Sequence, residues 1–152
     1  MKMVINNAMK NVLAVIDAQT KFINSCKSEN LIDRIVNKIK KRITDGYEIV
    51  FTFDDAGGDF PEDISKFSVG KKIYNKNTYG CKQLILDLNE AGTQNIEFIG
   101  VCTDVCVITN VLGTMAFLPF ADISIDSSCC ASSSDCHNAA LNVMRACNIK
   151  VF

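Results

Sequence analysis

Apolar positions along the chain alternate between continuous runs and runs with helical spacing. Residues 11–17 (NVLAVID) form a continuous apolar run that ends on a carboxylate, which is typical of a strand buried on both faces. Apolar residues then recur every three or four positions from Leu31 to Ile43, and Gly46 follows as a helix end. The same pattern predicts further strands over 47–53, 71–75, 95–101, 121–126 and 148–152. It also predicts three further helices. The first covers 81–91, the second begins at Thr103 or Asp104 and ends at Pro119, and the third begins at Ser133 or Ser134 and runs through Met144. The segment 54–68, rich in Asp and Gly, is expected to be a loop.

This alternation predicts an α/β fold in which helices cover both faces of a mainly parallel sheet. The sequence shows no internal repeat and no linker, and 152 residues suit one compact domain, so we treat 1–152 as a single domain. In such sheets the active site lies beyond the carboxyl ends of the strands, where the strand order reverses. That rule points to Asp17, to the region 54–76 and to the loop 100–106.

Composition and charge narrow the possible partners. The formal net charge of -1 gives no electrostatic case for binding nucleic acid or an anionic membrane. A basic cluster at 38–42 falls on a predicted helix with an apolar opposite face, which favours a solvated surface. The sequence has no apolar run of the ~18–20 residues needed to span a membrane and no signal core within residues 1–10, so we expect a cytoplasmic protein.

Cysteine is frequent, with eight residues in the chain. Without a signal segment, they are expected to be reduced thiols, mostly buried, rather than a disulfide framework. No Cys-x-x-Cys pair occurs and His137 is the only histidine, so a structural zinc cluster has little support.

Three residues lie at positions where the predicted fold places catalytic side chains. Cys106 falls in the first turn of a predicted helix, whose partial positive charge favours a reactive thiolate, although it could also be a buried structural cysteine. Asp17 ends an apolar strand, where a carboxylate needs a partner, a function or a capping role. Lys76 follows the predicted strand 71–75, and Lys72 competes with it as the functional lysine.

Considered together, these segments resemble the signatures of the isochorismatase-like, nicotinamidase-related hydrolases. The run 17–22 (DAQTKF) resembles the family's Asp-x-Gln-x-x-Phe motif, and 76–80 (KNTYG) resembles its catalytic lysine segment. The run 100–107 (GVCTDVCV) resembles its nucleophile segment very closely. Asp126, the serine-rich loop after it and His137 match the family's last strand-to-helix connection, where a histidine lies outside the triad. The resemblance covers 11–152 and implies a six-stranded sheet in the order 3-2-1-4-5-6.

The resemblance also implies a mechanism. Asp17, Lys76 and Cys106 would form a catalytic triad, with the side chains of Asp17 and Cys106 within the ~8 Å that one water can bridge. The backbone N–H groups of Cys102 and Cys106 would hold the oxyanion, with a cis peptide between residues 101 and 102. We expect Gln19, Phe22, Tyr79 and Thr103 to line the substrate pocket. Cys106 should react with iodoacetamide faster than the other cysteines.

The chain departs from the metal-binding members of this family. Those members carry Asp-x-His after the second strand, whereas this chain has 54–59 (DDAGGD) with no histidine. We therefore expect no cofactor and no His-based metal site, and we interpret Asp54, Asp55 and Asp59 as a solvated acidic loop that could still hold a hard cation. The missing histidines argue against nicotinamide itself as the substrate.

The sequence thus favours a cysteine hydrolase that cleaves a C–N bond of a small amide or ureido compound through a thioester. Two alternatives stay open: a non-catalytic binding protein that keeps the fold, and a thiol redox protein using Cys102 and Cys106. The expected partner is a small-molecule substrate, and family resemblance suggests a homo-oligomer, either a dimer or a tetramer.

Overall fold

The computed structural model describes residues 9–152 and contains a six-stranded parallel sheet in the order β3-β2-β1-β4-β5-β6. This confirms the expected topology. The strands are β1 (Asn11–Ile16), β2 (Glu48–Asp54), β3 (Lys72–Lys76), β4 (Asn95–Val101), β5 (Asp122–Ala131) and β6 (Lys150–Val151). Strand order reverses between β1 and β4, so the two strands that flank this point lie in the centre of the sheet.

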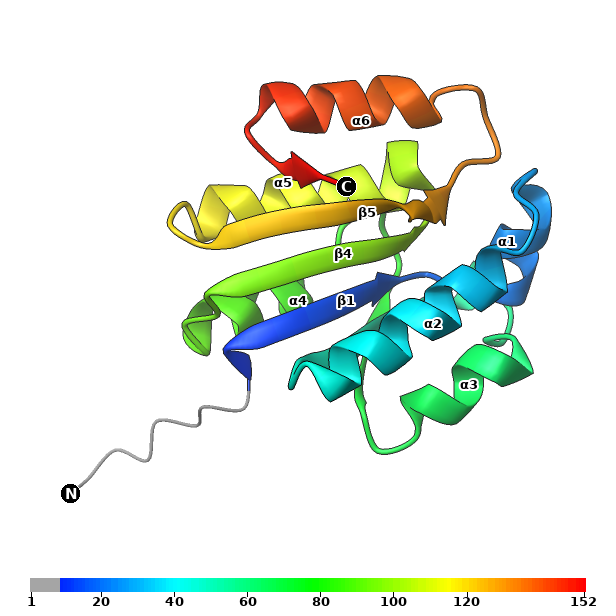
Figure 1. The fold of residues 1–152 in the computed structure, drawn as a ribbon, viewed down its shortest axis with the longest axis horizontal. Helices are drawn as coiled ribbons and strands as arrows, with labels where there is room; N and C mark the ends of the chain where they lie inside the picture. Colours follow the sequence, from blue (N-terminus) through cyan, green and yellow to red (C-terminus); the bar gives the residue numbers. More distant parts are fainter. Residues whose placement is uncertain (1–8) are drawn as a thin grey trace.

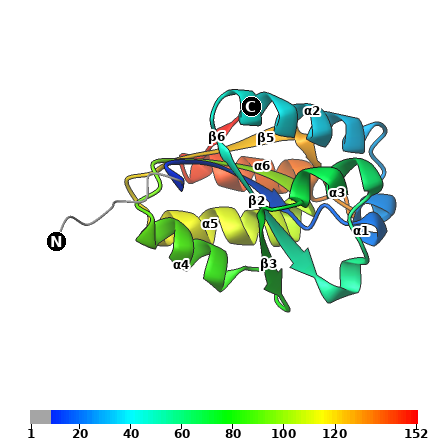
Figure 2. The same cartoon turned by 90° about the horizontal axis from the view of Figure 1, so that it is seen from below.

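Helices cover both faces of the sheet, which gives the three-layer arrangement (Figures 1 and 2). One face carries α1 (Thr20–Ser25), α2 (Leu31–Thr44) and α3 (Glu62–Ser68), and the other carries α4 (Lys82–Glu90), α5 (Ile108–Phe117) and α6 (His137–Ala146). Side chains of β1 alternate between two separate cores: Leu13 and Val15 pack with the first group of helices, and Val12, Ala14 and Ile16 with the second. All five are fully buried, which explains the uninterrupted apolar run of this strand.

Two short helices lie where the sequence pattern shows none. The segment 54–68, expected to be a loop, contains a 3-10 turn, η2 (Asp55–Gly57), and the helix α3, while α1 follows the first strand. Their residues show little periodicity, and each helix is held by an apolar side chain buried against the sheet, Ile23 in α1 and Ile64 in α3. The fifth strand is also longer than expected, since it continues to Ala131.

Gly100 allows the two central strands to approach each other at the carboxyl edge. It pairs with Ile16 in the register of β1 and β4 and has φ +123, and a Cβ built on it would lie 2.0 Å from the Ile16 carbonyl oxygen. A residue with a side chain would therefore push the end of β4 away from the end of β1. Within residues 9–152, no helix is both long enough and apolar enough to cross a membrane.

Candidate active site

The carboxyl ends of four neighbouring strands bring the expected residues together. Asp17 directly follows β1, Asp54 and Lys76 are the last residues of β2 and β3 and pair in register, and the segment of Cys106 follows β4. Asp17 has φ 44, a left-handed conformation that non-glycine residues rarely adopt, and its side chain is fully buried. A strained, buried carboxylate at this edge is typical of a functional position.

The ammonium group of Lys76 joins the carboxylate and the thiol. Its Nζ lies 2.7 Å from Asp17 Oδ2 and 3.6 Å from Cys106 Sγ, and it donates a hydrogen bond of 2.8 Å to the Thr78 carbonyl oxygen. These two short distances place the Asp17 oxygen and the Cys106 sulfur well within 8 Å of each other. Asp54 Oδ2 adds a second carboxylate 3.8 Å from the same Nζ. The structure therefore brings Asp17, Lys76 and Cys106 into one cluster, whereas Lys72 pairs with Asp87.

Thr52 fixes the orientation of the Asp17 carboxylate. Its hydroxyl donates to Asp17 Oδ1 at 2.6 Å and accepts from the Asp17 backbone N–H at 3.0 Å. Thr52 is fully buried on β2. With Oδ1 held in this way, Oδ2 is the oxygen that faces Lys76. The sequence motifs do not include this residue, and its only signal is a hydroxyl inside the otherwise apolar run 49–53 (IVFTF).

Charge and burial set the protonation of the two partners. Burial by itself lowers the pKa of Lys76, but the hydrogen bond and charge of Asp17 outweigh it and leave the pKa raised, so the amine is charged. Burial raises the pKa of the Cys106 thiol to about 12, the charge of Asp17 adds to the rise, and Lys76 opposes it only in part. With the pKa raised in this way, Cys106 rests as a thiol facing a carboxylate, and its place at a helix start does not offset the burial.

The segment after β4 forms a π-helical turn, η3 (Thr103–Val107), before α5 begins. The Cys102 carbonyl accepts from the N–H groups of Val105 at 3.2 Å and Val107 at 3.0 Å, while the N–H of Cys106 between them does not donate to it. No side chain caps the start of this turn, although Thr103 and Asp104, where the helix is predicted to begin, are residue types that can cap a helix. Such widened turns are frequent at functional sites.

Cys102 itself is unusual among the thiols of the site. The peptide between Val101 and Cys102 is cis, as expected. Interaction with the neighbouring Cys26 thiol and with Ser133 lowers the pKa of Cys102, although burial opposes the shift. The pKa of Cys102 therefore lies below the ordinary range of a thiol, and the order in which the thiols react with iodoacetamide stays a prediction. All eight cysteines are free.

The four expected substrate contacts occupy different surroundings. Gln19 is fully buried, and its amide donates to the carbonyls of Asp54 and Gly58 and accepts from the Asp54 N–H. Thr103 is also buried, with Oγ1 2.8 Å from His137 Nδ1. Phe22 lies on α1 and is partly buried against the core, and Tyr79 is 67% exposed. Gln19 and Thr103 thus hold neighbouring segments through hydrogen bonds, and Phe22 and Tyr79 are the two that keep accessible surface.

His137 is the only histidine, and the structure bonds it to Thr103. Burial lowers its pKa, and the charge of Asp104 opposes this effect. His137 therefore contacts the nucleophile segment through Thr103 and lies outside the triad.

Comparison with known proteins extends this picture. The isochorismatase domain model matches residues 11–152. No curated protein matches the sequence. Among solved structures, the nicotinamidase of Staphylococcus aureus has a TM-score of 0.80 at 22% identity, with 95% of this chain and 99% of that chain covered. A ribonuclease of Caenorhabditis elegans reaches 0.80 at 18% identity over 95% and 77% of the two chains. At these identities the likeness establishes the fold.

A third similar structure raises the question of a metal. It is a pyrazinamidase of Pyrococcus horikoshii in complex with zinc, with a TM-score of 0.76 at 19% identity over 94% of this chain and 98% of that chain. Within residues 9–152, no group of three or more His, Cys, Asp or Glu side chains is placed to hold a metal ion. Asp54 Oδ1 accepts from the Ala56 N–H, and Oδ2 faces Lys76. The donor set at the end of β2 therefore does not fit zinc.

Proposed function

This chain belongs to the isochorismatase family, and we propose that it is a cysteine hydrolase that cleaves the C–N bond of a small amide or ureido compound. One observation carries the proposal: Lys76 Nζ contacts both the Asp17 carboxylate and the Cys106 thiol at the edge where strand order reverses. A buried carboxylate and a thiol that contact the same ammonium group supply a base, a nucleophile and a cation.

The first half of the reaction forms a thioester. Asp17 accepts the proton of the Cys106 thiol as Sγ bonds to the carbonyl carbon of the substrate, and the carbonyl electron pair moves to its oxygen. The backbone N–H groups of Cys102 and Cys106 stabilise this oxyanion. When the oxyanion collapses, the C–N bond breaks, Asp17 returns the proton to the leaving nitrogen, and ammonia or an amine departs.

The second half regenerates the enzyme. Asp17, again a carboxylate, removes a proton from a water molecule that attacks the thioester carbon. The C–S bond breaks, the acid is released, and the Cys106 sulfur recovers a proton from Asp17. Lys76 stays charged throughout and stabilises the carboxylate and the thiolate in turn. A high thiol pKa in the resting site is consistent with this scheme, because the thiol then needs the adjacent base.

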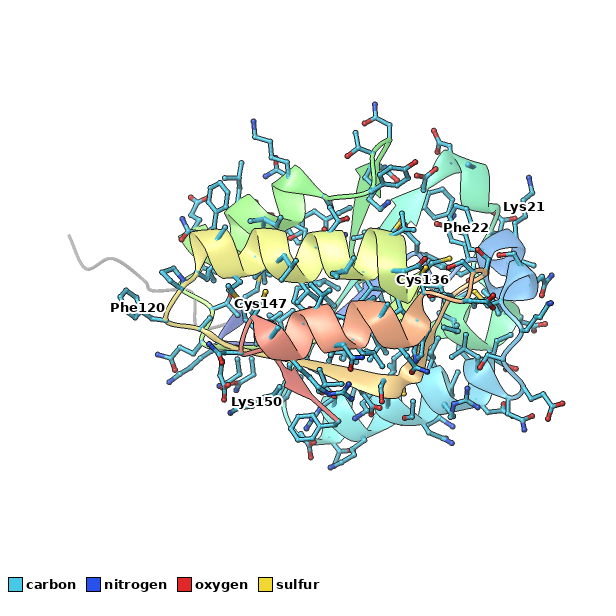
Figure 3. The ribbon with its side chains drawn as sticks, turned by 90° about the horizontal axis from the view of Figure 1, so that it is seen from above. Lys21, Phe22, Phe120, Cys136, Cys147 and Lys150 are labelled. Atoms are coloured by element: carbon cyan, nitrogen blue, oxygen red, sulfur yellow. The ribbon has the colours of Figure 1, made fainter. Side chains whose placement is uncertain are left out.

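Ammonia release from a panel of small primary amides and ureido compounds tests the proposal. We expect turnover of at least one compound by the native protein, none by Cys106→Ala or Asp17→Asn, and native turnover by Cys147→Ala. Cys147 is a suitable control because Figure 3 shows it at the end of the molecule opposite Phe22. Binding of a compound without turnover would instead support the non-catalytic alternative, and turnover by Cys106→Ala would reject a cysteine nucleophile.

A further inference from the structure

Asn110 is a fully buried polar residue that links two parts of the site. It lies on α5, one helical turn after Cys106. Its Nδ2 donates to the Cys106 carbonyl oxygen at 2.8 Å and to the Tyr79 carbonyl oxygen at 3.2 Å, and its Oδ1 accepts from the Cys81 N–H at 2.8 Å. One side chain thus bonds to the backbone of the nucleophile and to the backbone on both sides of Gly80.

The segment that Asn110 holds also carries an acceptor for the lysine. Lys76 Nζ donates to the carbonyl oxygen of Thr78, the residue before Tyr79. Gly80 comes close to the same helix, since a Cβ built on it would lie 3.1 Å from Thr109 Cγ2. The segment 77–81 therefore sits directly against the start of α5, and Asn110 supplies the hydrogen bonds across this contact.

Lys76 needs such support because of its place in the sheet. It is the last residue of β3, an edge strand that pairs with β2 alone. Beyond Lys76 the chain leaves the sheet, and Tyr79 is largely exposed. The backbone there has no strand neighbour to fix it, so contacts with α5 determine where the segment lies.

We propose that Asn110 is a positioning residue that ties the Lys76 segment to the backbone of Cys106 and so sets the distance between the ammonium group and the sulfur. The inference rests on the proposed function for its catalytic meaning, but the distance itself is a property of the resting protein. A side chain that merely stabilised α5 would have no reason to bond to residues 79 and 81.

The test uses the thiol pKa of Cys106, which can be measured without a substrate. The groups that face this thiol are Asp17 from the end of β1 and Lys76 from the end of β3, with Asp54 beside the lysine. Lys76 lowers the pKa of Cys106, so moving the ammonium away must raise it. The rate of iodoacetamide labelling of the Cys106 peptide, followed by mass spectrometry from pH 7 to 10, reports this change.

Asn110→Ser is the informative variant. A serine hydroxyl in a helix can still bond to the carbonyl four residues earlier, here that of Cys106, but it is too short to reach residues 79 and 81. We expect labelling of Cys106 to slow by about three- to tenfold, equal to a pKa rise of about 0.5 to 1. Asn95→Ser is the matched control, because it removes a hydrogen bond from Asn95 to Asn11 at the start of β4, the end opposite the nucleophile segment. Labelling of Cys106 in this variant should stay at the native rate.

A double-mutant cycle separates positioning from general support. If Asn110 acts through Lys76, Asn110→Ser has no further effect on labelling in a Lys76→Met background. An equal slowing in both backgrounds, or native labelling by Asn110→Ser, would overturn the proposal. Asn110→Thr provides a second variant that fills more of the space and adds no charge, should the serine variant fold poorly. Its side chain is also too short to reach residues 79 and 81, so its effect should also vanish without Lys76. Because the labelling test uses no substrate, a negative result rejects only the role of Asn110. The proposed hydrolase activity is tested separately by the ammonia assay.

Discussion

At the scale of single residues, the site combines groups whose charges depend on one another. Asp17 is fully buried, and its charge is balanced by Lys76 at 2.7 Å. The same carboxylate raises the pKa of the neighbouring thiol, so the base that Cys106 needs also keeps it protonated at rest. Sequence motifs identified all three residues, but the sign of the thiol's pKa shift could not be predicted, because it depends on burial and on distances that the sequence does not contain.

Substituting the charged partners should move the thiol pKa in opposite directions. Asp17→Asn removes a charge that raises the pKa of Cys106, so labelling at pH 9 should accelerate even though turnover is lost. Lys76→Met removes a charge that lowers it, so labelling should slow. Peptide mass spectrometry of iodoacetamide adducts measures both, with Cys102 as an internal reference. Slower labelling of Asp17→Asn would show that the carboxylate does not govern the thiol.

Thr52 offers a second test at this scale. Thr52→Val keeps the size of the side chain but removes the donor to Asp17 Oδ1, a hydrogen bond to a buried charge worth about 1.5–3 kcal/mol. We expect kcat to fall about 10- to 100-fold if this energy serves the transition state, while Thr52→Ser, which keeps the hydroxyl, stays near the native value. Equal activity of the valine and serine variants would contradict an orienting role.

At the scale of secondary-structure elements, the pattern of apolar residues predicted the six strands and four of the helices, while α1 and α3 were missed. These two helices have only six and seven residues, and their stability comes from Ile23 and Ile64 packing on the sheet rather than from local sequence preference. The partners of Thr52 and Asn110 were also beyond prediction, because Thr52 meets Asp17 through the pairing of β1 with β2 and Asn110 meets Tyr79 across a helix contact.

The close approach of β1 and β4 can be tested through Gly100. Gly100→Ala places a methyl group 2.0 Å from the Ile16 carbonyl oxygen, which must separate the strand ends that carry Asp17 and Cys102. We expect a loss of about 3 kcal/mol or more in unfolding free energy together with a loss of turnover. Gly70→Ala is the control, since Gly70 also has a positive φ but no atom within 4 Å of the added carbon. Similar denaturant midpoints for the two variants would show that the strands tolerate the methyl group.

The contacts of the residues after β2 predict that turnover does not depend on a metal ion. Asp54 is engaged with Ala56 and Lys76, and the reaction proposed here places its steps on protein groups alone. Turnover should therefore survive exhaustive treatment with a chelator, followed by removal of the chelator and assay of ammonia release. Loss of turnover that zinc or iron restores would show that the acidic residues 54–59 form a metal site.

At the scale of the whole molecule, topology explains why distant residues meet. Asp17, Lys76 and Cys106 are far apart in the chain, yet a parallel sheet places the carboxyl ends of all its strands at one edge, and Figure 1 shows β1, β4 and β5 running in the same direction. The order and spacing of the motifs were therefore enough to predict the fold and the cluster. The shape of the pocket was not predictable, because it depends on short helices and exposed side chains such as Tyr79.

The proposed mechanism requires that Cys106 be acylated during turnover. Native protein mixed with the amide that releases ammonia fastest, quenched in acid within the first turnovers and digested, should show the acyl group on the Cys106 peptide by mass spectrometry. The mass added should equal that of the amide minus ammonia, and Cys106→Ala should carry no adduct and release no ammonia. Ammonia release by the native protein with no acyl group on Cys106, and the same release by Cys106→Ala, would contradict the account.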